Sequence, residues 1–227
     1  MKPDTRRDTV AGPAGAIECA IDEPEAGAGV APATPRGAEA APTAPRGVVV
    51  LCHPHPQHGG TMDNKVVQTL ARAFVQLGYR AVRFNFRGVG GSAGAWDEGR
   101  GEIDDALAVI AAQRAASPGL PLALGGFSFG AYVAAQAAAR LAAAADAAPV
   151  ERLVLVGPAT SRFELPATVA PDTLVIHGEA DDVVPLAATL AWARPQVLPV
   201  IVFPGVGHFF HGQLTLLKQQ LIQAWRV

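Results

Sequence analysis

One serine of this chain stands in a setting that suits a nucleophile. Residues 122–131 read Leu-Ala-Leu-Gly-Gly-Phe-Ser-Phe-Gly-Ala, which places Ser128 at the centre of a G-x-S-x-G pattern. The two glycines permit a strained turn from a strand into a helix, with the hydroxyl at its tip and the positive end of the helix dipole beneath it. Glycines around a serine also occur in ordinary turns, so the pattern alone is weak. An apolar run before it and an alanine-rich stretch (131–141) after it favour a nucleophile elbow.

Candidates for a base and an acid lie downstream of Ser128. A serine hydroxyl is a poor nucleophile at neutral pH, so hydrolysis requires a histidine as base and a carboxylate that orients it. The apolar run 174–177 leads to Asp181, and the apolar run 200–203 leads to His208. Because the carboxyl ends of parallel strands share one edge of a sheet, we expect the three side chains to lie together.

Each of these two assignments has a competitor nearby. Asp182 competes with Asp181, and the spacing of four residues from His177 favours Asp181. His211 competes with His208. We favour His208 because it lies in a glycine-bounded loop after a strand, whereas His211 is expected to open the last helix, where the positive end of the dipole disfavours an imidazolium.

The elements that must position these residues alternate between strands and helices. Continuous apolar, β-branched runs indicate buried strands, and apolar residues at helical spacing indicate the helices between them. The predicted strands cover residues 16–21, 47–52, 80–86, 152–156, 173–177 and 200–203, with a further one from 122 to the serine motif; the predicted helices follow residues 63, 102, 130 and 185, and the last covers 214–225. This alternation predicts an α/β fold with a doubly wound, mostly parallel sheet and helices on both faces.

Composition agrees with such a fold and argues against several classes of protein. The 227 residues suit a single domain, and 50% hydrophobic against 17% charged residues suits a sheet covered on both faces. A formal net charge of −2 without a basic stripe argues against nucleic acid binding. Residues 22–46, rich in Ala, Pro and Gly, are expected to form a mobile loop.

The location of the protein can also be predicted. The N-terminus has no apolar signal region, and no stretch approaches the roughly 20 apolar residues of a membrane span. Cys19 and Cys52 form neither a C-x-x-C pair nor a disulfide framework, which favours free thiols in a reducing compartment. We therefore expect a cytoplasmic protein without a membrane partner.

The chain resembles an α/β-hydrolase from Gly47 to Val227. The order serine, acid, histidine matches that of the family and differs from the orders in chymotrypsin-like and subtilisin-like proteases. It is most similar to small, lidless bacterial members of the dienelactone-hydrolase-like group, which share His-Pro-His-Pro at 53–56, Gly-Gly-Thr-Met at 59–62 and HG-x-x-D-x-x-VP at 177–185. The resemblance implies esterase-type hydrolysis through an acyl-enzyme. Dienelactone hydrolases use cysteine where this chain has serine, so their substrate is not implied.

Two backbone N–H groups are needed to stabilise the oxyanion that develops during such a reaction. In this fold one comes from the residue after the nucleophile, here Phe129, and one from the loop after the first central strand. Pro54 and Pro56 have no N–H, which leaves His55 as the candidate by position as well as by resemblance. The His55 side chain is expected either to line the site or to bond a nearby carbonyl group.

A metal-dependent hydrolase is one alternative. His53, His55 and His58 have the H-x-H-x-x-H spacing of metallo-β-lactamase-like zinc sites. However, Gln57 stands where those sites usually have an aspartate, and the interleaved prolines restrict how the rings converge. This interpretation also leaves Ser128 unexplained, and the serine mechanism requires no metal or organic cofactor.

Two further alternatives concern binding. The sequence Gly88-x-Gly90-x-x-Ala93 follows a strand and loosely fits a nucleotide-binding fingerprint, but further glycines up to Gly101 keep the segment a loop, which we expect to border the active site instead. The other alternative is an α/β-hydrolase scaffold that binds a small molecule without catalysis.

The segment between two predicted strands bears on the substrate. Residues 157–172 are too few to form the helical lid that larger members of the fold insert there. An open pocket encloses little apolar area, so we expect short-chain esters or thioesters as substrates. The oligomeric state is left undetermined. Candidate apolar walls are Trp96, Phe127, Phe129, Phe209 and Phe210.

Overall fold

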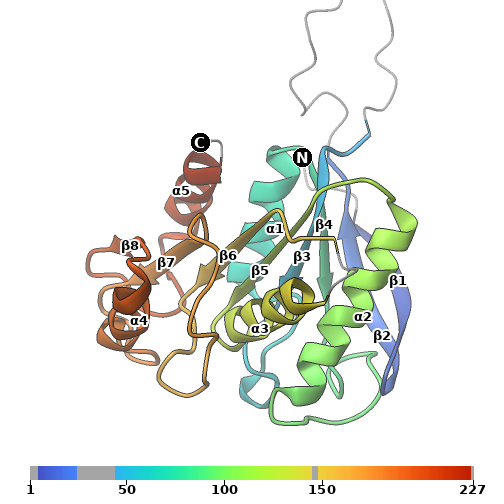
Figure 1. The fold of residues 1–227 in the computed structure, drawn as a ribbon, viewed down its shortest axis with the longest axis horizontal. Helices are drawn as coiled ribbons and strands as arrows, with labels where there is room; N and C mark the ends of the chain where they lie inside the picture. The colour runs from blue at the N-terminus through green and yellow to red at the C-terminus, as the bar shows by residue number, and fades with distance from the viewer. Residues whose placement is uncertain (1–4, 25–43, 145–147, 226–227) are drawn as a thin grey trace, which may run out of the picture.

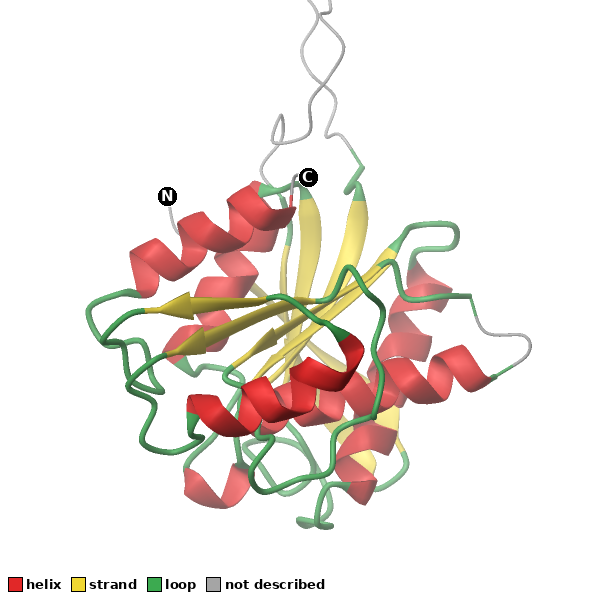
Figure 2. Ribbon diagram, turned by 60° about the vertical axis from the view of Figure 1, so that its left-hand side comes forward, coloured by secondary structure: helices red, strands yellow, loops and turns green. Residues whose placement is uncertain are grey.

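The computed structural model describes residues 5–24, 44–144 and 148–225, and these form one eight-stranded sheet with helices on both faces (Figures 1 and 2). In chain order the elements are β1 (Thr5–Gly12), β2 (Gly15–Asp22), β3 (Gly47–Cys52), η1 (Pro56–His58), α1 (Lys65–Gln76), β4 (Tyr79–Phe84), α2 (Arg100–Ala116), β5 (Leu122–Phe127), α3 (Phe129–Ala143), β6 (Arg152–Val156), β7 (Leu174–Gly178), α4 (Leu186–Ala193), η2 (Arg194–Gln196), β8 (Val200–Phe203) and α5 (Leu214–Trp225).

The strand order is β1-β2-β4-β3-β5-β6-β7-β8. From β4 to β8 all neighbours are parallel, whereas β1 and β2 form an antiparallel hairpin that adds to the edge of β4. The parallel part begins with β3 in its middle and winds to both sides. Because its strands are parallel, the carboxyl ends of β3, β5, β6, β7 and β8 lie at the same edge of the sheet. The predicted doubly wound, mostly parallel α/β fold without a cap domain is confirmed.

The side chains of the parallel strands alternate between two apolar layers. Val50, Leu124 and Leu155 pack with α2 and α3 on one face, and Val49 and Val154 pack with α1 and α5 on the other. Strands β3 and β5 are buried along their whole length, so each reads as a continuous apolar run in the sequence. Figure 2 shows the twist of this sheet between its two helical layers.

The structure corrects the sequence prediction at the N-terminal edge. Residues 5–12 form strand β1, which was not predicted because its side chains are exposed or half-exposed and carry no apolar periodicity. Asp22, predicted to begin the mobile loop, is instead the last residue of β2 and is buried. Most of the predicted loop, residues 25–43, lies outside the described residues.

The remaining differences are small. Helix α2 begins at Arg100 rather than near residue 102, since the Glu102 carboxylate accepts hydrogen bonds from the N–H groups of Asp97 and Gly99 and caps the helix. Among the described helices, none has both the length and the apolar character that crossing a bilayer demands.

Candidate functional site

Ser128 occupies a sharp turn between β5 and α3. Its backbone has φ 57° and ψ −120°, a strained conformation for a residue with a side chain. The N–H of Ser128 donates to the carbonyl oxygen of Val156 at 2.9 Å, which ties the turn to the end of β6. The serine lies just before the first residue of α3, so its side chain is at the positive end of that helix.

The glycines on either side of Ser128 make this turn sterically feasible. A Cβ atom on Gly126 would collide with the backbone of Gly130, and one on Gly130 would collide with the carbonyl groups of Cys52 and His53 at the end of β3. The turn is therefore packed directly against the loop that follows β3. This agrees with the predicted nucleophile elbow.

His208 and Asp181 form a short, buried pair. The Nδ1 atom of His208 donates to Oδ2 of Asp181 at 2.6 Å, and neither residue is more than 7% exposed. Because Nδ1 carries the hydrogen in this bond, Nε2 is the basic nitrogen of the ring. The ring lies between Phe127, at 4.8 Å between centroids, and Gly157, where a Cβ would be 3.3 Å from it.

Asp181 is held in place by its own loop. Its Oδ1 atom accepts hydrogen bonds from the N–H groups of Val183 at 2.9 Å and Val184 at 2.7 Å. Burial raises the pKa of Asp181, but the hydrogen bonds from His208, Val184 and Val183 outweigh it and hold the pKa below the usual value. The carboxylate is thus charged at neutral pH and both of its oxygens are occupied.

His177 is a residue whose part in the site was missed from the sequence. It is fully buried, and its Nε2 atom donates to the Val184 carbonyl oxygen at 2.9 Å and lies 3.3 Å from Oδ2 of Asp181. Burial lowers the pKa of its imidazole. His177 therefore fixes the loop that presents Asp181. Its place four residues before the acid in the HG-x-x-D segment was the available signal.

The structure separates the two competing residues from this pair. Asp182 is exposed and makes no ion pair with any described residue. His211 is exposed, and its ring lies tilted against that of Phe209 at 5.7 Å between centroids. The expectation that His211 opens the last helix is wrong, because α5 begins three residues later at Leu214.

Ser128 and His208 line the same cavity, which has a volume of about 600 Å³. No hydrogen bond joins their side chains in the described part of the chain, a common situation in sites without substrate. The other walls come from three loops, which contain residues 54–64, 159–163 and 183–184 respectively, and from Phe129 and Phe209. Asn64, Arg162 and Phe163 were not predicted as site residues, since each lies in a loop segment without a recognisable motif.

The predicted aromatic walls divide into two groups. Phe129 and Phe209 line the cavity directly, and Trp96 packs behind it on His55 and Phe129 at 4.5 and 5.1 Å between centroids. Phe127 and Phe210 are fully buried in the core on the side of α1 and α5. Expecting Phe127 and Phe210 in the cavity wall was therefore wrong.

The backbone N–H groups of His55 and Phe129 are both available at the cavity. Phe129 is the first residue of α3, so its N–H has no acceptor within the helix. His55 lies between two prolines, and its N–H donates to no acceptor among the described residues, while its carbonyl accepts from His58 and Gly60. Both residues line the cavity together with Ser128.

Among the described residues, the three histidines after β3 do not form a group that could hold a metal ion. His53 is fully buried: its Nδ1 donates to the Pro54 carbonyl at 2.6 Å and its Nε2 accepts from the N–H of Phe86 at 3.1 Å. His55 Nδ1 accepts from the N–H of Gln57. With both nitrogens of His53 engaged by the backbone, the set does not fit the proposed zinc ligands.

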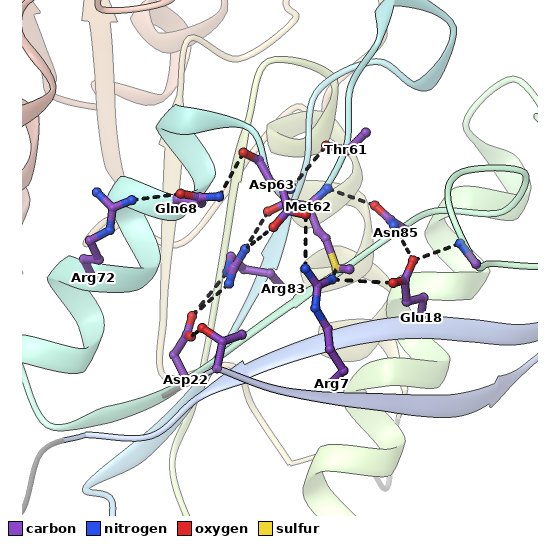
Figure 3. Close-up of polar contacts among 12 residues, drawn as sticks. Arg7, Glu18, Asp22, Thr61, Met62, Asp63, Gln68, Arg72, Arg83 and Asn85 are labelled. Atoms are coloured by element: carbon purple, nitrogen blue, oxygen red, sulfur yellow. Dashed lines mark hydrogen bonds and ion pairs between the residues drawn. The ribbon is translucent and has the colours of Figure 1, made fainter. Parts of the chain in front are cut away.

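The loop after His55 is anchored to β4. Asn85 accepts from the N–H of Met62 at 2.9 Å, and Arg83 donates to the Met62 carbonyl at 2.9 Å while it pairs with the buried Asp22 (Figure 3). Arg7 of β1 donates to the Met62 sulfur at 3.6 Å. Both polar backbone groups of Met62 are thus held by side chains, which fixes the loop that lines one wall of the cavity.

The glycine-rich loop after β4 does not resemble a nucleotide site. Residues 87–99 contain no helix, and their N–H groups at Gly91 and Ala93 bond to Glu18 and Ala16 of β2. The predicted contact with the active-site region is made at its far end, where Trp96 packs on the His55 ring.

Comparison with known proteins agrees with this geometry. The Hydrolase_4 family model, described as serine aminopeptidase S33, matches residues 43–169, more than half of the chain. The structure of XC6422 from Xanthomonas campestris, described as an α/β serine hydrolase without lid, aligns over 100% of this chain and 95% of its own, with 36% identity and a TM-score of 0.83. The chain belongs to the α/β-hydrolase superfamily. The predicted membership is confirmed, and within the superfamily the chain is similar to small serine hydrolases that lack a lid.

Two more proteins are similar to this chain. An α/β serine hydrolase homologue from Coxiella burnetii is 35% identical, with 98% of both chains aligned and a TM-score of 0.77. The uncharacterized protein RP471 of Rickettsia prowazekii is 44% identical over 90 residues, or 39% of this chain. That match spans only 38% of the Rickettsia protein.

Proposed function

We propose that this protein hydrolyses short-chain carboxylic esters or thioesters through an acyl-enzyme on Ser128. The observation that carries the proposal is the shared cavity, which Ser128 borders from the strained elbow and His208 borders while bound to Asp181. A catalytic triad of Ser128, His208 and Asp181 accounts for all three placements. A merely structural serine does not account for the strained φ of 57° at its position.

In the first half of the reaction, Ser128 Oγ attacks the carbonyl carbon of the substrate while His208 Nε2 takes the hydroxyl proton. Asp181 keeps the His208 hydrogen on Nδ1 and stabilises the imidazolium. The negative charge that forms on the carbonyl oxygen accepts hydrogen bonds from the N–H groups of His55 and Phe129. The C–O or C–S bond then breaks, and the leaving alcohol or thiol takes the proton from His208.

In the second half, water hydrolyses the acyl-enzyme. His208 Nε2 takes a proton from water as its oxygen attacks the acyl carbon, and the same two N–H groups stabilise the second oxyanion. The bond to Ser128 Oγ breaks, and His208 returns the proton to that oxygen. The products are a carboxylic acid and the free enzyme, so that the chain's own residues suffice.

The description of the matching family model raises aminopeptidase activity as a second candidate. An aminopeptidase must bind the ammonium group of its substrate, which calls for a carboxylate or several carbonyl acceptors near the scissile bond. In the described part of the chain, the cavity wall contains no Asp or Glu, and Arg162 lies in it. This charge pattern favours ester or thioester hydrolysis over removal of an N-terminal amino acid.

The proposed function has a direct test. Purified wild-type protein, Ser128→Ala and Ser161→Ala are compared on p-nitrophenyl esters and acyl thioesters of increasing chain length, with an aminoacyl p-nitroanilide as the peptidase probe. Ser161 is exposed and does not line the cavity, so it is a matched control. We expect Ser128→Ala to lose at least about a thousandfold in kcat while Ser161→Ala keeps it. Full activity in Ser128→Ala, or cleavage of the anilide alone, contradicts the proposal.

We further propose that the protein acts on a small molecule in the cytoplasm, without nucleic acid or membrane as a partner. The net charge of −2 and the free, buried thiols of Cys19 and Cys52 support this. Burial raises the pKa of Cys19 to about 12, so its thiol is unreactive at neutral pH.

A further inference from the structure

Arg162 is a cation of the cavity wall that neither the fold nor the proposed triad uses. It lies in the loop between β6 and β7, and its side chain is exposed at the wall of the cavity that Ser128 borders. Most other arginines of the described residues have a carboxylate, an aromatic ring or a carbonyl as partner. Arg162 takes part in none of the ion pairs between described residues.

The position of Arg162 is fixed by its neighbours. The N–H groups of Arg162 and Phe163 both donate to the Ala159 carbonyl, at 3.1 and 3.0 Å, and form a tight turn. The Phe163 ring stacks on Tyr132 at 4.9 Å between centroids and packs against Phe129 at 5.1 Å. The backbone at Arg162 is thereby held next to α3, and its guanidinium has only its own side-chain torsions to order when it binds a ligand.

The surroundings of Arg162 in the cavity are basic or neutral. His55 and His58 line the same cavity, with their ring centroids 4.6 Å apart, and the His55 ring centroid is 6.1 Å from that of Phe163. Burial lowers the pKa of His55, and the nearby His58 and Arg162 lower it further. Within the described ranges, no carboxylate lines the cavity to neutralise this charge.

We propose that Arg162 forms an anion subsite, and that the substrate is an ester or thioester that also carries a carboxylate or phosphate group. This deepens the proposed function, on which it rests, by naming the class of substrate. A guanidinium pairs with carboxylate and phosphate through two parallel hydrogen bonds, and partial exclusion of water in a cavity strengthens such pairs. His58 also lines the cavity, and its ring can add a hydrogen-bond donor.

The anion can belong to either half of the substrate, and two matched pairs of substrates distinguish the halves. The first pair is the p-nitrophenyl monoester of glutarate and p-nitrophenyl valerate, which have acyl chains of equal length with and without a carboxylate. The second pair is butyryl-coenzyme A and butyryl-N-acetylcysteamine, which have leaving groups with and without phosphates.

The measured quantity is the ratio of kcat/KM for the anionic substrate to that for its neutral partner. In Arg162→Gln we expect this ratio to fall about tenfold or more for one pair, since a charge-assisted hydrogen bond contributes that much. Arg162→Lys keeps the charge without the planar fork and is expected to lie in between. Arg194→Gln is the matched control, because Arg194 is exposed, has no ion-pair partner among the described residues and lies outside the cavity.

Salt gives a second readout that a structural role of Arg162 would not change. Raising the ionic strength should lower the ratio of kcat/KM between the anionic and the neutral substrate in wild-type protein and in Arg194→Gln. In Arg162→Gln this ratio should depend much less on ionic strength. A ratio that is the same in wild type and Arg162→Gln for both pairs overturns the proposal.

Failure of the proposed function can be told apart from failure of this inference. If wild-type protein hydrolyses none of the four substrates, the proposed function fails, and calorimetry of monomethyl glutarate and of coenzyme A on wild type and Arg162→Gln decides the inference. Binding of either compound that weakens about tenfold or more in Arg162→Gln supports the anion subsite. Equal binding, or none, overturns it.

Discussion

Two loops at the carboxyl edge of the sheet each contain a buried histidine, and they use it differently. After β3, His53 gives both ring nitrogens to the backbone, at Pro54 and Phe86. After β8, His208 gives only Nδ1 to a side-chain partner, Asp181, and its other nitrogen bonds to no described residue. A histidine with both nitrogens bonded to backbone groups is a structural crosslink, whereas one with a carboxylate behind it and a cavity in front is able to move a proton.

The two loops are also held in place by different kinds of residues. The His53 side is braced by Arg83, Asn85 and the buried Asp22 through Met62 (Figure 3). The His208 side is braced by the Asp181 loop, which His177 holds at the Val184 carbonyl. Variants on the first side should therefore affect mainly stability, and variants on the second side mainly catalysis.

The largest effect is expected for His208→Gln. Without a base behind Ser128, kcat on a p-nitrophenyl ester should fall about 10⁴-fold or more. The urea midpoint should change little by comparison, because the glutamine still fills much of the imidazole volume. Steady-state kinetics and urea unfolding of the same preparation check both parts. If His208→Gln unfolds at a much lower urea concentration but keeps its kcat, His208 serves stability rather than catalysis, and the account is contradicted.

Arg83→Met is the corresponding test of the first side. It leaves the Asp22 carboxylate, whose side chain is 5% exposed, without its buried partner, which should cost about 3–5 kcal/mol of unfolding free energy. The double variant Arg83→Met with Asp22→Leu should recover much of that loss, since it removes the uncompensated charge. Urea unfolding measures the set. If Arg83→Met is as stable as wild type, the Arg83–Asp22 pair does not stabilise this loop, which contradicts the account.

The free energy of unfolding should depend on pH because the pKa of a buried histidine is lower in the folded protein than in the unfolded chain. Burial lowers the pKa of His53 from 6.5 to about 4, so between these values the unfolded chain binds a proton that the folded protein does not. Stability should therefore be complete above pH 6.5 and fall as the pH drops toward 4, by up to about 3 kcal/mol from this residue. The lowered pKa values of His177 and Asp181 act in the same direction.

His53→Asn tests the origin of that slope. The asparagine amide can still donate to the Pro54 carbonyl but no longer reaches the Phe86 N–H, which should cost about 1–3 kcal/mol at neutral pH. The fall in stability between pH 6.5 and 4 should shrink relative to wild type and to the control His58→Gln, whose ring is exposed. An unchanged slope in His53→Asn would assign the pH dependence to other groups.

The sequence predicted the parts of the molecule that depend on local pattern. The strands at 47–52 and 152–156 coincide with β3 and β6, because strands buried on both faces are continuous apolar runs. The half-buried edge strand β8 coincides with the short β-branched run at 200–203. Asp181 and His208 were predicted as acid and base from the sequence because each lies shortly after a predicted strand. Their contact is a consequence of the parallel topology.

What the sequence did not predict depends on contacts between distant segments. Strand β1 is an exposed edge without apolar alternation, and its register comes from pairing with β2. Arg162 reaches the cavity from a loop without a motif. His53 was weighed as a metal ligand because its partner, the N–H of Phe86, lies 33 residues away in the chain.

The most direct test of the central claim is covalent labelling of the protein with a fluorophosphonate, followed by peptide mass spectrometry. If Ser128 is activated by His208 and Asp181, one equivalent should attach to the peptide that contains Ser128, and labelling should slow at least about a hundredfold in His208→Gln. An adduct on another residue, or equal labelling rates in wild type and His208→Gln, would contradict the account.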